Sequence, residues 1–169
     1  MKYIGAVLVF AACLGGGIYR AMLIKKRVRT LEGLAAALEL MRGEICQRLL
    51  DMPTVFEKIL PTVNRETRPF FEELSASSDK LGDLPLSEIW RGCAEKNLYI
   101  LHEGELNALC ALGETLGRYD ALIQSNAIEG TLDVIKASLR EASAQSAGGV
   151  KTAIGVGASL GLMLLITLI

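Results

Sequence analysis

Residues that commonly carry chemistry are scarce in this sequence. It has one histidine and four cysteines, and no two of the cysteines lie close together along the chain. Structural zinc needs four converging cysteine or histidine ligands, usually with a close cysteine pair, so no metal site is expected. Neither a glycine-rich phosphate loop after a strand nor a Gly-x-Ser-x-Gly motif occurs. The sequence therefore predicts no enzyme, no cofactor and no small-molecule substrate.

Aromatic residues are also few, at 5% of 169 residues, although 51% are hydrophobic and the mean hydropathy is +0.36. The aliphatic excess lies at the two ends, where Tyr3–Tyr19 and Thr152–Ile169 contain no charge. As helices rising about 1.5 Å per residue, these runs would reach roughly 25 to 27 Å, close to the thickness of a bilayer core. We therefore expect an N-terminal transmembrane anchor over residues 1–24 and a C-terminal transmembrane helix over residues 151–169.

Positive charge is concentrated on the inner side of both uncharged runs, with only Lys2 on the other side. The flanking cations are Arg20, Lys25, Lys26, Arg27, Arg29 and Lys151. By the positive-inside rule, they place the central domain in the cytoplasm and both termini on the outer side of the cell membrane. A basic flank after the apolar run also disfavours a signal peptide. The stretch Phe10-Ala-Ala-Cys13 faintly resembles a lipoprotein cleavage site, so cleavage or lipidation remains an alternative.

The central segment is acidic and shows helical periodicity. Residues 30–150 contain 11 Lys/Arg against 19 Asp/Glu, a net charge of −8, which argues against nucleic-acid binding. Apolar residues recur at helical spacing in three stretches: Leu31, Leu34, Leu38, Met41, Ile45 and Leu49; Leu106, Leu109, Gly113 and Leu116; and Ile128, Leu132, Ile135, Leu139 and Ala142. We predict an all-α antiparallel bundle of about six helices over residues 25–150, flanked by the two transmembrane helices.

Shorter helices are expected between the first two of these stretches. Pro53 should stop the first long helix, and Thr54, Thr67 and Ser87 are expected to cap the starts of three further helices. The turn-rich residues 75–85 connect two helical halves. Trp90 is expected in the core, because no converging polar groups suggest a cofactor site around it.

Glycines in the end segments suggest close helix packing in a membrane. Gly16 and Gly17 each follow a small residue four positions earlier, and Gly157 with Gly161 forms a GxxxG pair. Such faces are compatible with a homo-oligomer, although glycine is common in membrane helices and explains the first pair equally well. Residues 143–149 are expected to form a short flexible joint to the second span.

Two further expectations concern positions inside the helical patterns. Gly113 and Gly130 each cost about 1 kcal/mol relative to alanine in a helix, which suggests close backbone packing at both. Glu44 and Arg48 are spaced to pair at i,i+4 on a solvated face. Glu44 orienting a partner is the alternative interpretation.

The stretch Leu112–Gln124 is expected to form a tight corner between two long helices. Gly117 suits the left-handed conformation that ends a helix, and Asp120 can accept hydrogen bonds from the free amides of the next helix. Helices joined by so few residues must run antiparallel. The histidine, His102, is expected to lie in a loop or cap a helix.

A family resemblance is carried by a series of motifs. Ala37-Leu-x-x-Met-x-x-Glu-Ile45 follows the first span and its basic flank, Pro53 and Trp90 come next, and Leu112-Gly-x-x-Leu-Gly-x-x-Asp-x-x-x-Gln124 precedes the last span. This order resembles the stage III sporulation protein AB (SpoIIIAB) family over essentially the whole chain. One departure is Met52-Pro-Thr54, where the family usually has Thr-Pro-Leu.

The resemblance implies a non-enzymatic membrane platform subunit of the SpoIIIA–SpoIIQ apparatus between mother cell and forespore. The family domain is similar to the F-domains of type II secretion and type IV pilus platform proteins, which implies a SpoIIIAA-like ATPase and other SpoIIIA membrane proteins as partners. A membrane-anchored regulatory or sensor domain that binds a cytoplasmic signalling partner is the rival interpretation. The candidate interaction residues are Glu44, Gly113, Gly117, Arg118, Asp120 and Gln124.

Overall fold

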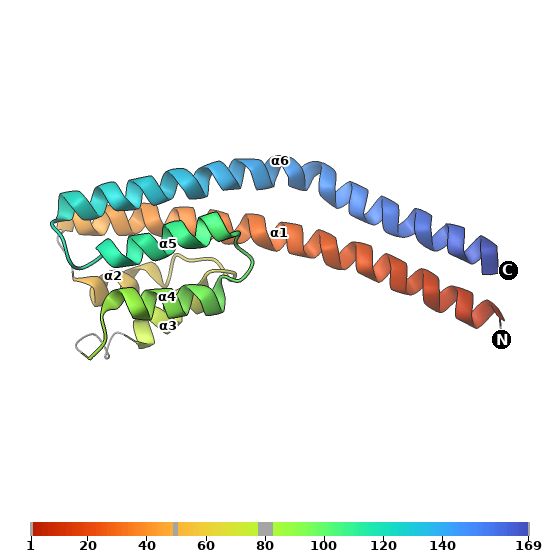
Figure 1. The fold of residues 1–169 in the computed structure, drawn as a ribbon, viewed down its shortest axis with the longest axis horizontal. Coiled ribbons are helices and arrows are strands. Elements are labelled where there is room, and N and C mark those ends of the chain that lie inside the picture. Colours follow the sequence, from red (N-terminus) through yellow and green to blue (C-terminus); the bar gives the residue numbers. More distant parts are fainter. Residues whose placement is uncertain (1, 49–50, 78–82, 169) are drawn as a thin grey trace. The chain divides into compact units, whose positions relative to one another are not determined.

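The computed structural model describes residues 2–48, 51–77 and 83–168, which form helices joined by turns and short irregular segments. The six helices there are α1 Lys2–Arg48, α2 Met52–Ile59, α3 Arg68–Ala76, α4 Leu86–Asn97, α5 Glu103–Thr115 and α6 Ala121–Leu168 (Figure 1). The prediction of an all-α helical bundle is confirmed. Two compact units are formed, one by residues 29–140 and the other by residues 1–28 together with 141–169.

The helix count differs from the prediction, because the end segments are continuous with bundle helices. α1 continues through Ile24 and α6 continues through residues 143–149, so the expected flexible joint was wrong. Neither helix contains a proline, so nothing removes a backbone hydrogen bond inside them. In the unit of residues 1–28 and 141–169, a Cβ on Gly149 would contact Ile24 Cδ1 at 3.4 Å, which is ordinary packing.

The search for membrane-crossing helices gave no candidate: within the described part of the chain, no helix has both the length and the apolar character that such a crossing requires.

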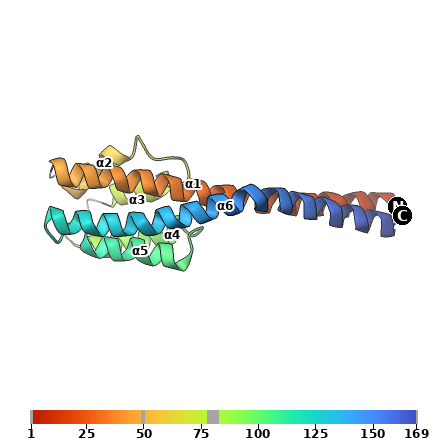
Figure 2. The same cartoon turned by 90° about the horizontal axis from the view of Figure 1, so that it is seen from above.

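The unit of residues 29–140 contains an antiparallel pair of long helices, in which α1 and α6 lie side by side (Figures 1 and 2). Lys136 pairs with Glu39 at 2.5 Å, and Arg42, one turn further along α1, pairs with the earlier Glu129 of α6 at 3.5 Å. This order requires opposite chain directions. Most of the predicted apolar residues of both helices are buried: Leu31, Leu34, Leu38, Met41, Ile45, Ile128, Leu132, Ile135 and Ala142. Leu139 is only half-buried, and Leu49 is outside the described residues.

An aromatic cluster forms the centre of this unit. Trp90 of α4 is fully buried, as predicted; its ring centroid lies 5.1 Å from that of Phe70 in an edge-to-face arrangement and 6.2 Å from that of Phe56. Its indole Nε1 donates a 2.7 Å hydrogen bond to the carbonyl of Leu109 in α5. A Cβ on Gly113 would lie 2.5 Å from Trp90 Cδ1, so only glycine leaves room for the indole. The close packing predicted at Gly113 is confirmed.

The starts of the short helices correct the prediction in detail. Asp51 precedes α2 and its Oδ1 accepts a 2.8 Å hydrogen bond from Thr54 Oγ1, so Thr54 lies inside the helix rather than at its start. Pro53 occupies the first turn of α2, where its missing N–H is not needed. Pro85, rather than Ser87, precedes α4. The predicted positions of Thr67 before α3 and of His102 before α5 are confirmed.

An unpredicted side chain, Asn64, ties the connection between α2 and α3 to α1. Its Nδ2 donates to the carbonyl of Arg29 at 2.6 Å, and its Oδ1 accepts from the Thr67 amide at 3.1 Å and hydroxyl at 2.8 Å. A Cβ on Gly33 would lie 2.5 Å from Asn64 Oδ1. Gly33 therefore allows the connection to approach α1 closely.

The two interior glycines of α5 and α6 are expected to respond oppositely to alanine. Gly113→Ala places a methyl group against the buried indole, so we expect a loss of about 1–3 kcal/mol in the free energy of unfolding. Gly130 is exposed with nothing within 4 Å of an added Cβ, against prediction, so Gly130→Ala should gain about 0.5–1 kcal/mol. Urea unfolding followed by Trp90 fluorescence measures both. A loss of similar size in both variants would contradict this account.

Candidate interaction site

The corner between α5 and α6 is built on a single left-handed residue. α5 ends at Thr115, Leu116 is fully buried, and Gly117 has φ +73°, the conformation predicted from the sequence. Residues with a Cβ are strained at this φ, which makes glycine the natural occupant. The chain then reaches the start of α6 at Ala121 within three residues.

The side chain of Gln124 fixes this corner from inside. Its Oε1 accepts a 3.1 Å hydrogen bond from the Gly117 amide, and its Nε2 donates a 2.6 Å hydrogen bond to the Tyr119 carbonyl. Gln124 is buried, so neither backbone group depends on water for its partner. One amide group thus satisfies both a donor and an acceptor of the corner, which gives Gln124 a structural role.

The remaining motif positions of the corner face solvent. Asp120 was expected to cap α6 through its carboxylate. Instead, its backbone carbonyl accepts a 3.0 Å hydrogen bond from the backbone N–H of Gln124. Within the described part of the chain, no hydrogen bond to the Asp120 carboxylate is found, and the residue is exposed. Arg118 is exposed as well. Of the predicted corner residues, Arg118 and Asp120 are therefore the ones whose side chains a partner can reach.

Glu44 lies apart from the solvated face predicted for it. It is 9% exposed, and its Oε2 accepts a 2.9 Å hydrogen bond from Lys58 Nζ of α2. The side chain of Arg48, the predicted partner, lies outside the described residues. Burial and a cross-helix ion pair indicate that Glu44 holds α2 against α1, and the expectation of a solvated side chain was wrong.

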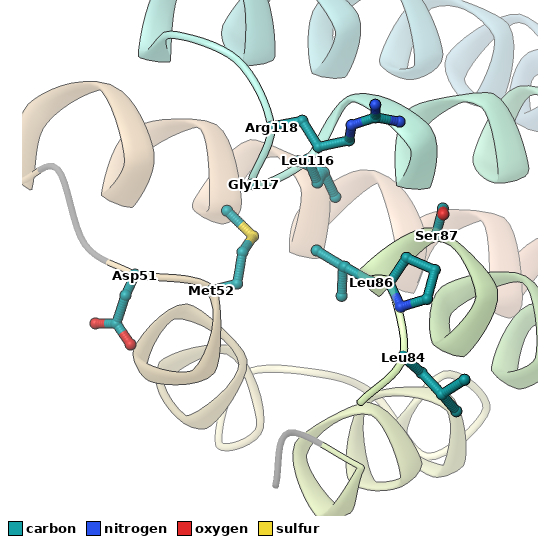
Figure 3. A pocket seen from close by; sticks show the side chains of 9 residues that line it. Asp51, Met52, Leu84, Leu86, Ser87, Leu116, Gly117 and Arg118 are labelled. Carbon is teal, nitrogen blue, oxygen red and sulfur yellow. The ribbon is translucent and has the colours of Figure 1, made fainter. Parts of the chain in front are cut away.

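A pocket of about 520 Å³ opens beside the corner (Figure 3). Its lining comes from the start of α2, the approach to α4 and the corner itself: Asp51, Met52, Leu84, Pro85, Leu86, Ser87, Leu116, Gly117 and Arg118. Figure 3 shows Met52, Leu86 and Leu116 pointing toward one another, with Arg118 at the edge. The pocket thus has an apolar floor and a charged rim.

Gly117 links the corner to both other walls of the pocket. A Cβ on Gly117 would lie 3.6 Å from Leu86 Cδ2 and 3.7 Å from Met52 Cγ. The second charged lining residue, Asp51, points away from these side chains (Figure 3). The hydrogen bond from Thr54 lowers the pKa of the Asp51 carboxyl from its ordinary value, so this carboxylate is charged at neutral pH. The Asp51 carboxylate therefore already has a hydrogen-bond partner, Thr54 of α2.

The sequence did not reveal this pocket, because its walls come from three segments far apart along the chain. Of the predicted interaction residues, Gly117 and Arg118 line the pocket. Leu84 and Pro85 belong to a stretch predicted only as a connection. The one sequence signal was the Met52-Pro-Thr54 departure, and Met52 does lie in the pocket floor.

The predicted membrane and topology residues fall mainly in the unit of residues 1–28 and 141–169. Gly17 is buried, whereas nothing lies within 4 Å of a Cβ placed on Gly16. Gly157 and Gly161 are helical, but their surroundings lie outside the described residues, as does the side chain of Lys151. The other predicted cations are distributed as follows: Arg20 and Lys25 are exposed, Lys26 is half-buried, Arg27 lines a small cavity with Ile24, Ala142, Gln145 and Gly149, and Arg29 pairs with Glu66 at 3.5 Å.

The pocket lining combines apolar side chains with the guanidinium of Arg118 and the carboxylate of Asp51. Among the residues that the structure describes, no group of three or more His, Cys, Asp or Glu side chains is placed to hold a metal ion.

Comparison with known proteins gives one consistent family. The model of the family described as stage III sporulation protein AB matches residues 2–169. A relative from Bacillus subtilis (strain 168), also named stage III sporulation protein AB, is 27% identical over 170 residues, which cover 99% of each chain. A solved structure of stage III sporulation protein AB (SpoIIIAB) has 26% identity and a TM-score of 0.63, covering 71% of this chain and 95% of that one.

Removing the Gln124 amide should weaken the corner. Gln124→Ala leaves the Gly117 amide and the Tyr119 carbonyl without their partner, so we expect a loss of about 1–3 kcal/mol in the free energy of unfolding. Asn126→Ala is the matched control, because Asn126 is exposed two residues further along α6 and should change stability by less than about 0.5 kcal/mol. Urea unfolding and hydrogen exchange at the Gly117 amide report the effect. Equal stability of the two variants would contradict the clamp.

Proposed function

The chain belongs to the stage III sporulation protein AB family, which gives it a role in sporulation, and we propose that it serves there as a platform subunit. In this proposal it is a non-enzymatic component of the SpoIIIA–SpoIIQ apparatus between mother cell and forespore. It holds a SpoIIIAA-like ATPase and other SpoIIIA membrane proteins. The observation that carries the proposal is the family match across residues 2–169, rather than over one motif alone.

The helical unit of residues 29–140 supports a holding role. Its interior is formed mainly by apolar stripes and the aromatic cluster, and five ion pairs between described residues each connect two helices. Such a body can transmit a load between its ends without changing shape, because packed interiors are dense and have low compressibility. The accessible chemistry is confined to binding surfaces such as the rim around Arg118.

We propose that both chain ends anchor this domain in the membrane. The support is the sequence of the ends, since Tyr3–Tyr19 and Thr152–Ile169 are uncharged and the cations that flank them lie on their inner sides, apart from Lys2. In this arrangement residues 25–150 face the cytoplasm and both termini lie on the outer side. Anchors at both ends would hold the helical domain against the membrane while a partner works against it.

Direct binding tests the ATPase part of the proposal. The full chain purified in detergent should bind the purified SpoIIIAA-like ATPase with a Kd near the micromolar range, about −8 kcal/mol. Fluorescence anisotropy of labelled ATPase, with empty detergent micelles as the control, measures this. Absence of binding at roughly 100 µM chain would remove the ATPase from the proposal and favour the regulatory alternative.

A topology reporter tests the anchoring. A reporter that is active only outside the cytoplasm should be active when fused after Ile169, because the C-terminus is placed on the outer side. The same reporter fused after Val150, before the second uncharged run, should be inactive. Cytoplasmic readout from both fusions would overturn the proposed orientation of the C-terminal end.

A further inference from the structure

The pocket beside the corner has the size and lining of a binding site. Its volume of about 520 Å³ lies within the range of known ligand pockets, and its floor is made by Met52, Leu86 and Leu116 (Figure 3). Leu116 is fully buried and Met52 is 9% exposed, so the floor is held by the packing of the domain. An apolar side chain that enters the pocket would be removed from water, and the surrounding helices would not need to move.

Apolar residues are also exposed around this pocket. Among the described residues of 29–140, six large hydrophobic side chains are exposed; one of them lines the pocket, and three others lie within five residues of Arg118 along the chain. These four are Leu84, Tyr119, Leu122 and Ile123, which are 45%, 51%, 73% and 47% exposed. Exposed apolar groups gathered in one region mark surfaces that a partner covers.

The charge that an occupant meets there is Arg118. Asp51 points away and is engaged by Thr54, and the carboxylate one turn before Arg118, that of Glu114, is held by Arg91 at 2.9 Å. Of the ten Lys and Arg side chains described between residues 29 and 140, seven form ion pairs. Arg118 has no ion-pair partner among the described residues, and it is the only one of the other three that lines the pocket.

From this geometry we propose that the pocket receives a peptide segment of a partner protein in which a large apolar residue lies next to an aspartate or glutamate. The apolar side chain enters between Met52 and Leu86, and the carboxylate pairs with the guanidinium of Arg118. A guanidinium binds a carboxylate through two parallel hydrogen bonds, which a basic or neutral segment does not offer. The inference rests on the proposed function in taking the partner to be the cytoplasmic ATPase.

Substitution at the rim tests the charge requirement. With full chain in detergent and purified SpoIIIAA-like ATPase, Arg118→Glu should weaken binding about tenfold or more, whereas Arg118→Lys should retain most of it. Arg65→Glu is the matched control, because Arg65 is an exposed arginine of the same unit that does not line the pocket. An unchanged free energy of unfolding in the Arg118 variants shows that the loss of binding does not come from a loss of stability. Equal binding by Arg118→Glu and Arg65→Glu would overturn the pocket while leaving ATPase docking intact.

A second pair of variants tests the apolar requirement. Leu84→Ser should weaken binding severalfold, because Leu84 is an exposed apolar lining residue. Tyr99→Ser is its control, since Tyr99 is 67% exposed in the same unit but outside the pocket. Equal effects of the two substitutions would count against an apolar anchor at this position.

Photocrosslinking identifies the occupant whether or not the ATPase binds. The photoreactive amino acid p-benzoylphenylalanine replaces Ser87, a half-buried lining residue, in the full chain produced in sporulating cells. Mass spectrometry should find a crosslinked peptide of another protein with an acidic residue within two positions of a large apolar one, and Arg118→Glu should abolish the crosslink. Such a peptide from a protein other than the ATPase would retain the pocket and replace the partner. A peptide from a second copy of this chain, or no crosslink, would overturn the inference.

Discussion

The packing of one indole against one glycine fixes the arrangement of the shorter helices. Trp90 is fully buried, contacts aromatic rings from α2 and α3, and donates a hydrogen bond to the backbone of α5. This position requires that Gly113 have no side chain, because any Cβ there would overlap the indole. Aromatic edge-to-face pairs add about 0.5–1.5 kcal/mol beyond the area they bury. Four helices therefore share one point of contact, and the walls of the pocket depend on it.

The family motif separates into residues that shape the corner and a residue left available. Gly117 supplies the left-handed turn and Gln124 closes it with two hydrogen bonds, so both are explained by folding alone. Gly113 is explained by the indole above it. Arg118 lies between these structural residues, yet no hydrogen bond or ion pair of its guanidinium is found among the described residues. An exposed side chain that has no hydrogen bond or ion pair of its own, and whose neighbours are fixed by the fold, is well placed for recognition.

How much the sequence predicts depends on how local the determining interaction is. Helical stripes and the left-handed Gly117 follow from spacing and backbone sterics of neighbouring residues, and both predictions were confirmed. Glu44 was misread because its partner, Lys58, lies on another helix, which spacing along α1 does not reveal. Gly113 and Gly130 look alike in sequence and differ only in what packs against them.

Contacts between segments that are distant in sequence also explain why the candidate site was predicted only in part. Arg118 and Gly117 were found through their motif, but the pocket needs Met52 and Leu86 beside them, and those contacts exist only after α2 and α4 have docked. The continuity of α1 and α6 was missed for a related reason. A change in composition near residues 24 and 150 indicated a change in environment, and a helix can pass through such a change without ending.

The charge distribution of the domain limits where an acidic segment can dock. Residues 30–150 carry a net charge of −8, so most of this surface repels a carboxylate. Ion pairs such as Arg91–Glu114 engage most of the described cations; exposed pairs of this kind contribute only about 0–1 kcal/mol each. Their larger effect here is to neutralise positive charge elsewhere on the domain. Screening at physiological salt limits these interactions to about 8 Å. The charges therefore discriminate between docking positions only when the segment is already close to the surface. An apolar–acidic segment is then excluded from the rest of the surface by repulsion and retained at Arg118 by attraction, which gives specificity even where the attraction itself is modest.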